Sequence, residues 1–289
     1  MKHRDTRKRE PLVPRLARGL FATLGGRLPG PLSWLALKLW SKTRRFPRSA
    51  GERRALARAE ADFVPLGDCR VAVWRWPQAA QRRRGRVLLV HGWNGRGGQW
   101  YRLAEALHGA GYEAVVFDAP GHGASDGGSS SLFRFADAIT ALARRDAPFD
   151  AVVTHSFGIF PASLTSGSTR PRRVVAIAAP SDFDRLVTRF ADWMAMPERM
   201  RAAFRATIAA RHGADLARRV SPPVLLRRHG AHVMVVHDRD DAIVPFACGE
   251  ALAAALPDSR LLTTSGLGHG RILRDPEVVS AVVDFITAG

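Results

Sequence analysis

One serine lies where a strand-like segment meets a helix-like segment. Residues 152–158 read V-V-T-H-S-F-G, so Ser156 follows an apolar, β-branched run. A sharp turn here would raise the serine hydroxyl above a sheet and leave the amide of Phe157 as a donor to an oxyanion. Thr154 stands where the G-x-S-x-G pattern has its first glycine. The segment predicts a nucleophile, and an ordinary serine in a turn is the alternative.

A serine hydroxyl is a weak nucleophile and needs a base that is oriented by a carboxylate. The segment S-G-L-G-H-G-R-I-L places His269 after the last apolar run of the chain. The segment V-V-H-D-R-D-D-A-I-V-P-F places Asp238, Asp240 and Asp241 after the run before it. The order serine, acid, histidine along the chain differs from the order in two other triad folds. These residues predict acyl transfer, with three candidates for the acid.

Two glycine-rich loops follow earlier apolar runs. In residues 91–100, H-G-W-N-G-R-G-G-Q-W, Gly92 permits a sharp turn that can direct the amide of Trp93 into a cleft as a second oxyanion donor. A helix cap or a phosphate cradle is the alternative, but the loop lacks both the G-x-x-x-x-G-K-[ST] and the G-x-G-x-x-G spacing. In residues 117–127, we expect His122 to hold a tight loop by hydrogen bonds rather than to take part in chemistry.

Short apolar runs alternate with helical stretches from residue 87 onward. The runs span 87–90, 114–117, 151–154, 174–178, 233–236 and 260–264, and a hairpin of 61–64 with 70–76 precedes them. Strands that are apolar almost throughout are typical of a parallel sheet covered on both faces. The pattern predicts an α/β fold with a mostly parallel central sheet, helices on both faces and a helical cap insert. Ligands bind at the carboxyl ends of such strands, where the candidate residues lie.

The cap insert is the long stretch at about 182–230, which has helical periodicity and no strand candidate. Its position predicts a lid. Its aromatic and methionine side chains predict an apolar acyl pocket, and the insert's own core is the alternative. The predicted substrate-binding residues are Trp93, Phe190, Trp193 and Met194, with Phe183 and Met196 nearby in the sequence.

The net charge of +18 is concentrated in residues 1–60, which carry sixteen Lys or Arg and four Asp or Glu. We expect these residues to form a basic helical N-terminal segment and residues 61–289 to form the catalytic domain. Apolar residues recur in the segment near helical spacing, so it suits peripheral contact with an anionic membrane. Packing on the rest of the protein is the alternative. Arginine bias alone, without a recognition module, does not indicate nucleic-acid binding.

Only Cys69 and Cys248 are present, which excludes a disulfide framework and a cysteine-rich metal site. We therefore expect a cytoplasmic location. The basic segment also suggests peripheral attachment to the inner face of the membrane. The sequence does not indicate an oligomeric state.

From about Arg70 onward the chain resembles the α/β-hydrolase superfamily, over roughly three quarters of its length. The motifs that carry the resemblance are H-G-W, D-x-P-G-H-G-x-S, H-S-F-G, D-D-x-x-V-P and G-H-G. The resemblance implies Ser156 as nucleophile, His269 as general base and acid, and the amides of Trp93 and Phe157 as the oxyanion hole. The family pattern H-G-x-x-D-x-x-V-P implies Asp241 as the acid.

Other carboxylates stay open as alternatives to Asp241. Asp238 and Asp240 are expected to be solvated or to structure their loop. Some members of the superfamily carry the acid after an earlier strand, which would favour Asp182 or Asp184. His155, beside the serine, is expected to pack or to support other residues rather than to act as a base.

These observations predict a serine hydrolase that cleaves carboxylic esters with apolar acyl groups through an acyl-enzyme. Peptide, amide and lactone substrates remain open because the same machinery serves them. The chemistry requires neither a metal nor an organic cofactor, and the expected partner is a small-molecule ester. The alternative is a catalytically silent binding protein of the same fold, associated with a membrane surface.

Overall fold

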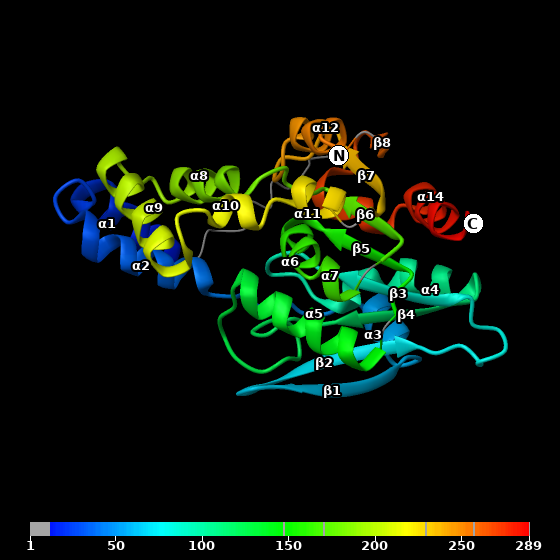
Figure 1. Ribbon diagram of the computed structural model, residues 1–289. Coiled ribbons are helices and arrows are strands. Elements are labelled where there is room, and N and C mark those ends of the chain that lie inside the picture. Colours follow the sequence, from blue (N-terminus) through cyan, green and yellow to red (C-terminus); the bar gives the residue numbers. More distant parts are fainter. Residues whose placement is uncertain (1–11, 147, 170, 229, 257, 289) are drawn as a thin grey trace, which may run out of the picture. The chain divides into compact units, whose positions relative to one another are not determined.

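The central sheet is mostly parallel (Figure 1). The computed structural model describes residues 12–146, 148–169, 171–228, 230–256 and 258–288. Within these ranges eight strands form one sheet in the spatial order β1-β2-β4-β3-β5-β6-β7-β8. The strands are β1 (Glu60–Leu66), β2 (Cys69–Trp76), β3 (Gly85–Val90), β4 (Tyr112–Phe117), β5 (Ala151–His155), β6 (Arg173–Ile177), β7 (His232–Asp238) and β8 (Arg260–Thr264). β1 and β2 form an antiparallel hairpin, β2 is antiparallel to β4, and the other neighbours are parallel.

The predicted α/β fold is confirmed, and each predicted apolar run lies in a strand to within one residue. The central strands are mostly apolar because helices cover both faces of the sheet, as in β3, where residues 87–90 are completely buried. On one face the side chains of Leu89 and Val153 join a core with those of α4 (Tyr101–Gly109) and α14 (Pro276–Thr287). The other face carries α5 (Leu132–Asp146), α6 (Ile159–Leu164) and α12 (Phe246–Ala254).

The remaining helices include three that precede the sheet in the chain and four in or near the insert. They are α1 (Leu12–Leu24), α2 (Pro29–Ser41), α3 (Ala50–Leu56), α7 (Ser166–Thr169), α8 (Phe183–Trp193), α9 (Glu198–His212), α10 (Leu216–Arg219), α11 (Pro222–Arg228) and α13 (Gly268–Arg271). In the described part of the chain, none of the helices combines the length and the apolar character needed to cross a bilayer.

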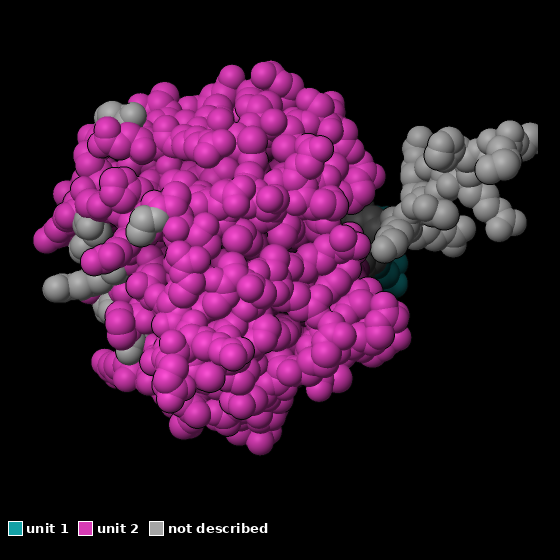
Figure 2. Space-filling view, turned by 90° about the vertical axis from the view of Figure 1, so that its right-hand side faces the viewer, with its two compact units in different colours: residues 1–41, 184–217 teal, residues 42–183, 218–289 magenta. Residues whose placement is uncertain are grey.

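The chain divides into two compact units, which are coloured separately in Figure 2. The helical unit consists of residues 1–41 and 184–217, and the sheet unit consists of residues 42–183 and 218–289. This grouping differs from the expected division into residues 1–60 and 61–289 with an insert at about 182–230. Residues 1–11 of the expected N-terminal segment lie outside the described residues.

The helical unit has its own core, in which α2 packs on α9. The ring of Trp40 lies 5.2 Å from that of Phe190 and 5.3 Å from that of Phe204, measured between centroids. Ser33 and Thr207 share a hydrogen bond of 2.7 Å between their hydroxyl groups. These contacts join segments more than 140 residues apart in sequence, so side chains of α2 serve packing within this unit.

Residues 42–60 pack in the sheet unit through a buried ion pair. Arg96, in the loop after β3, donates from Nε and Nη2 to the two carboxylate oxygens of Glu52 on α3, at 2.7 and 2.9 Å. Both side chains are buried, with exposed fractions of 10% and 5%. The bidentate geometry satisfies both oxygens of the carboxylate and fixes α3 to the loop.

We expect Glu52→Ala to lower the free energy of unfolding by about 3–5 kcal/mol, because it leaves the Arg96 guanidinium buried without its partner. Urea unfolding measures this change. The matched control is Glu105→Ala, which removes the exposed ion pair with Arg58 and should cost at most about 1 kcal/mol. Equal losses in the two variants would contradict the special role of the buried pair.

Candidate active site

Ser156 occupies a strained turn between β5 and α6. Its φ is +51°, in the left-handed region that non-glycine residues rarely adopt. A short 3₁₀ turn at residues 156–158 joins the end of β5 to the start of α6. Ser156 is partly exposed, whereas Phe157 and Gly158 are buried. Such strain costs on the order of 1–3 kcal/mol and is concentrated at functional sites.

Two glycines allow the backbone around this turn to approach the end of β3. A Cβ at Gly158 would lie 2.8 Å from the carbonyl oxygens of Val90 and His91, so no larger residue fits. A Cβ at Gly92 would lie 3.0 Å from the Cβ of Ser156. The H-G-W loop therefore lies directly against the serine turn.

Thr154 is accommodated without a glycine at that position. Its side chain is fully buried, and its hydroxyl donates to the carbonyl oxygen of Val175 on β6 at 3.1 Å. The tightest approach thus falls at Gly158 rather than at residue 154. The replacement of the pattern's first glycine by Thr154 therefore leaves the residues of the turn, Ser156 to Gly158, in place.

His269 and Asp241 form a hydrogen-bonded pair. Nδ1 of His269, on α13, lies 2.8 Å from Oδ2 of Asp241, whose side chain is fully buried. The other carboxylate oxygen, Oδ1, accepts from the backbone N–H groups of Ile243 and Val244, each at 2.8 Å. The imidazole of His269 is 19% exposed, so it keeps access to solvent.

The carboxyl group of Asp241 is kept ionised by its partners. Burial alone would raise its pKa, but the hydrogen bonds from His269, Val244 and Ile243 outweigh burial and lower the pKa below the usual value. His237 adds a further contact, with its Nε2 3.7 Å from Oδ2. A fixed anion at Nδ1 of His269 favours the tautomer whose Nε2 can accept a proton.

The other two aspartates of this segment hold the loop that leads to His269. Asp238 is buried and accepts from the hydroxyl of Thr264 at 2.7 Å and from the amide of Leu267 at 3.0 Å. Asp240 accepts from the amide of Gly266 at 2.7 Å. Both carboxylates therefore structure the loop, one of the two roles expected for them.

The two earlier candidates for the acid have other contacts. Asp182 accepts a hydrogen bond from Ser181 at 3.2 Å. Asp184 belongs to the helical unit and lies 3.5 Å from Arg205 there. Among the described residues, the only carboxylate bonded to the His269 ring is that of Asp241.

His155 links the serine turn to His269. Its Nε2 lies 2.9 Å from the carbonyl oxygen of His269, which makes Nε2–H the donor, and the two rings are 4.6 Å apart. Burial and the neighbouring His269 lower the pKa of His155 to about 3. A neutral imidazole that donates to a main-chain carbonyl supports its neighbour rather than exchanging protons.

An aromatic cluster surrounds the predicted oxyanion residues. The ring of Trp93 lies edge-on to those of Phe157 and His122, at centroid distances of 5.2 and 5.4 Å. Phe135 of α5 contacts all three rings. The cluster fixes residues 93 and 157 on one side of the serine turn.

His91 and His122 hold the loops after β3 and β4. Nδ1 of His122 lies 3.1 Å from the carbonyl oxygen of Pro120, which confirms the loop-holding role predicted for this histidine. Nε2 of His91 accepts from the amide of Ala119 at 3.0 Å. Burial is the main cause that lowers the pKa of His91 to about 4 and that of His122 to about 3.

The apolar residues predicted to bind substrate from the insert lie in the helical unit. Phe190 contacts Trp40, Trp193 and Phe204, and Met194 is buried. Trp193 is 47% exposed. Phe190 and Met194 therefore contribute to the core of their own unit, which was the alternative expectation, and their binding of substrate stays a prediction.

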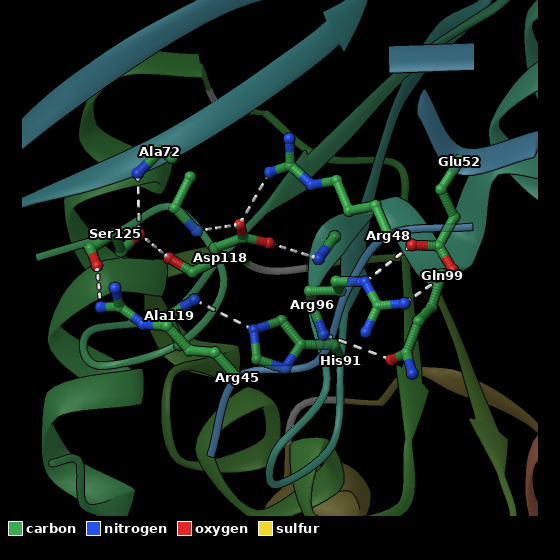
Figure 3. A network of polar contacts seen from close by, with 12 residues as sticks. Arg45, Arg48, Glu52, Ala72, His91, Arg96, Gln99, Asp118, Ala119 and Ser125 are labelled. Atoms are coloured by element: carbon green, nitrogen blue, oxygen red, sulfur yellow. Dashed lines mark hydrogen bonds and ion pairs between the residues drawn. The ribbon is translucent and has the colours of Figure 1, made fainter. Parts of the chain in front are cut away.

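Residues 42–49 form a strap across the two loops of the site, a feature that the sequence analysis missed (Figure 3). Thr43 donates to the carbonyl oxygen of Gly121 at 2.7 Å, and the amide of Arg44 donates to the side chain of Asn94 at 2.8 Å. Arg45 donates to the carbonyl oxygens of Ser125 and Gly127, each at 2.7 Å. The only signal in the sequence was the run of basic residues Lys42, Arg44, Arg45 and Arg48.

Asp118 anchors the same two loops and contacts the strap. This fully buried carboxylate accepts from the amides of Gly97 at 2.6 Å and Ala124 at 2.7 Å, and Arg48 of the strap lies 3.4 Å away. A Cβ at Gly123 would overlap the carboxylate, and its φ of +46° also suits glycine. One acidic side chain thus joins the loops after β3 and β4.

In the described ranges, no group of three or more His, Cys, Asp or Glu side chains is arranged to hold a metal ion.

The family assignment follows from comparison with known sequences. Residues 87–282 match the sequence model of the Alpha/beta hydrolase family, and the chain belongs to this family. This confirms the resemblance inferred from the motifs. Membership supports hydrolase activity.

Solved structures of low sequence identity share the fold. A putative lipase from Acinetobacter baumannii AYE superposes with a TM-score of 0.62 at 16% identity, covering 84% of this chain and 97% of that one. Esterases from Thermogutta terrifontis and Rhodococcus sp. ECU1013 superpose with TM-scores of 0.59 each, at 18% and 21% identity. Each covers 80% of this chain and 99% of its own.

A short stretch of the chain is similar to a named esterase. It is 35% identical over 57 residues to a pimeloyl-[acyl-carrier protein] methyl ester esterase from Aromatoleum aromaticum. The match spans 20% of this chain and 23% of that relative, so the chain matches about a quarter of the length of the relative.

The three buried histidines predict how stability depends on pH. Their pKa values in the folded protein are about 4, 3 and 3, below the value of about 6.5 in an unfolded chain. Their contribution to stability is complete above pH 6.5 and is lost as the pH falls toward the folded values. Between pH 6.5 and 5, each should lower the free energy of unfolding by about 1.1 kcal/mol per pH unit on average, with the slope approaching about 1.4 near pH 5, measured by urea unfolding.

The contribution of one histidine is tested by His122→Gln, which should reduce this slope by about one third. His232→Gln, at an exposed position, is the control and should leave the slope unchanged. An unaltered slope in His122→Gln would show that His122 takes up a proton in the folded state.

Proposed function

We propose that the protein is a serine hydrolase that cleaves carboxylic esters through an acyl-enzyme. Ser156 is the nucleophile, His269 the general base and acid, and Asp241 the carboxylate that orients the imidazole. The amides of Trp93 and Phe157 bind the oxyanion. The observation that carries the proposal is the buried Asp241–His269 pair, whose histidine is tied by a 2.9 Å hydrogen bond to the residue before a serine of positive φ.

In the proposed reaction, Nε2 of His269 takes the proton of the Ser156 hydroxyl as Oγ attacks the ester carbonyl carbon. The tetrahedral oxyanion accepts hydrogen bonds from the two amides. When it collapses, the bond to the alcohol breaks, and the leaving alkoxide takes the proton from the imidazolium. Water then attacks the acyl-enzyme by the same steps, releasing the carboxylic acid and restoring the serine.

We propose esters with apolar acyl groups as the substrate class, with peptides, amides and lactones as alternatives. The matched stretch of an enzyme named as a methyl ester esterase supports the choice of esters. The lid role of residues 182–230, and acyl binding by Trp93, Phe190, Trp193 and Met194, belong to the same proposal. Turnover of p-nitrophenyl esters of graded chain length by the native protein tests the apolar preference.

We expect Ser156→Ala to lower kcat for a p-nitrophenyl ester by roughly 10³–10⁶-fold, because the variant lacks the hydroxyl that is proposed to carry the acyl group. A fluorophosphonate probe should label the native protein and not this variant. Ser280→Ala, at an exposed position on α14, is the control and should keep both properties. A folded native protein that neither reacts with the probe nor turns over esters would favour the binding protein over the enzyme.

The choice of acid is tested by Asp241→Asn and Asp240→Asn. The first should lower kcat by roughly 10³–10⁴-fold, because an amide stabilises the wrong tautomer of His269 and cannot balance the charge of the imidazolium. The second should have a much smaller effect, since Asp240 bonds only to backbone amides of the loop in the described structure. A larger loss in Asp240→Asn would reject Asp241 as the acid.

A further inference from the structure

Helix α1 carries an apolar face that no part of the described structure covers. Leu12, Val13 and Leu16 are 66%, 62% and 63% exposed, and Leu20 is 36% exposed. These positions follow the spacing i, i+1, i+4 and i+8, which places them on one side of a helix. The exposed residues thus form a continuous aliphatic stripe of about two turns, which we call the α1 stripe.

The opposite side of α1 is packed. Ala17 and Phe21 are buried, and Phe21 has no exposed surface. One side of α1 is therefore already packed within the protein. The α1 stripe is a second apolar surface on the other side of the helix.

Exposed apolar side chains are concentrated in this part of the chain. Of the twelve large hydrophobic residues that are exposed in the described ranges, six lie between residues 12 and 34. The six are Leu12, Val13, Leu16, Leu20, Leu28 and Trp34. Exposed apolar residues that gather in one region of a surface are typical of an interaction site.

The charge of the same segment has one sign. Residues 12–41 contain four basic residues, Arg15, Arg18, Arg27 and Lys38, and no Asp or Glu. Arg15 and Arg27 are exposed. In the sequence, residues 2–10 add five basic and two acidic residues.

We propose that α1 docks on the surface of an anionic lipid bilayer, with the α1 stripe at the level of the acyl chains and the cations at the headgroups. An amphipathic helix of this kind binds by buried apolar area together with attraction to anionic lipid. Aliphatic side chains offer nothing to a nucleic-acid backbone, so the combination favours lipid over nucleic acid. The proposal goes beyond the ester hydrolase function and holds whether or not Ser156 is a nucleophile.

The experiment measures co-sedimentation of the full chain with vesicles of phosphatidylcholine alone or with 30% phosphatidylglycerol. The native protein should bind the anionic vesicles at low salt and lose binding as NaCl rises. Leu12→Gln/Leu16→Gln should lower the partition coefficient about tenfold or more, because it removes aliphatic surface without weakening helix propensity. Arg15→Gln/Arg27→Gln should lower it about fivefold per cation.

The matched controls change comparable residues of the sheet unit. Val224→Gln/Leu261→Gln removes two exposed aliphatic side chains, and Arg82→Gln/Arg274→Gln removes two exposed cations. Both should bind like the native protein. Circular dichroism and turnover of a soluble ester should be the same as for the native protein in all four double variants, whereas Ser156→Ala should bind vesicles normally although it has lost turnover.

Three results would overturn the proposal. The first is equal vesicle binding by the native protein and the Leu12→Gln/Leu16→Gln variant. The second is a dimer in light scattering that this variant abolishes, without any vesicle binding, since a second copy would then cover the stripe. The third is binding of the native protein to a DNA or RNA oligonucleotide and not to anionic vesicles.

Discussion

The candidate site depends on the close approach of the serine turn to the end of β3. A Cβ at Gly158 would lie 2.8 Å from the carbonyl oxygens of residues 90 and 91, and a Cβ at Gly92 would lie 3.0 Å from that of Ser156, so the two segments approach as closely as glycine allows. β5 lies between β3 and β6 in the middle of the sheet, and this fixes the ends of the strands. A serine at positive φ can persist there because the surrounding strands overdetermine its position, although the conformation itself is unfavourable.

Two buried carboxylates complete this arrangement, and each is satisfied mainly by backbone amides. Asp241 holds the loop after β7 and orients His269, whereas Asp118 joins the loops after β3 and β4. Burying an ion is costly unless donors surround it, so neither loop can move away without exposing an unpaired charge. Around them, His91 and His155 stay neutral over the physiological pH range, since burial lowers both pKa values to about 4 or below. The site therefore combines ionised carboxylates with neutral imidazoles, an arrangement that supports the proposal of His269 as the general base.

The sheet and the order of the candidate residues could be predicted from the sequence because both depend on local patterns. Short apolar runs that alternate with helical stretches are typical of buried parallel strands, and each motif follows such a run directly. The division of the N-terminal segment could not be predicted, because contacts such as Trp40 with Phe190 and Arg96 with Glu52 join distant residues by shape and charge rather than by spacing. The sequence alone could not show how the turn accommodates Thr154 in place of glycine. In the structure its hydroxyl donates a hydrogen bond to the carbonyl oxygen of Val175.

The excess positive charge of the first sixty residues has two physical uses. In residues 42–60 several cations are bound by carbonyl oxygens and carboxylates of the sheet unit, as Arg45 is by the loop at residues 125–127 and Arg48 is by Asp118. These charges act at short range and stabilise loops. Residues 12–41 contain four basic and no acidic residues, and the same stretch exposes aliphatic side chains. Exposed cations and exposed aliphatic side chains on one segment can both be satisfied by a partner that offers anions and hydrocarbon. The surface of an anionic lipid bilayer offers both.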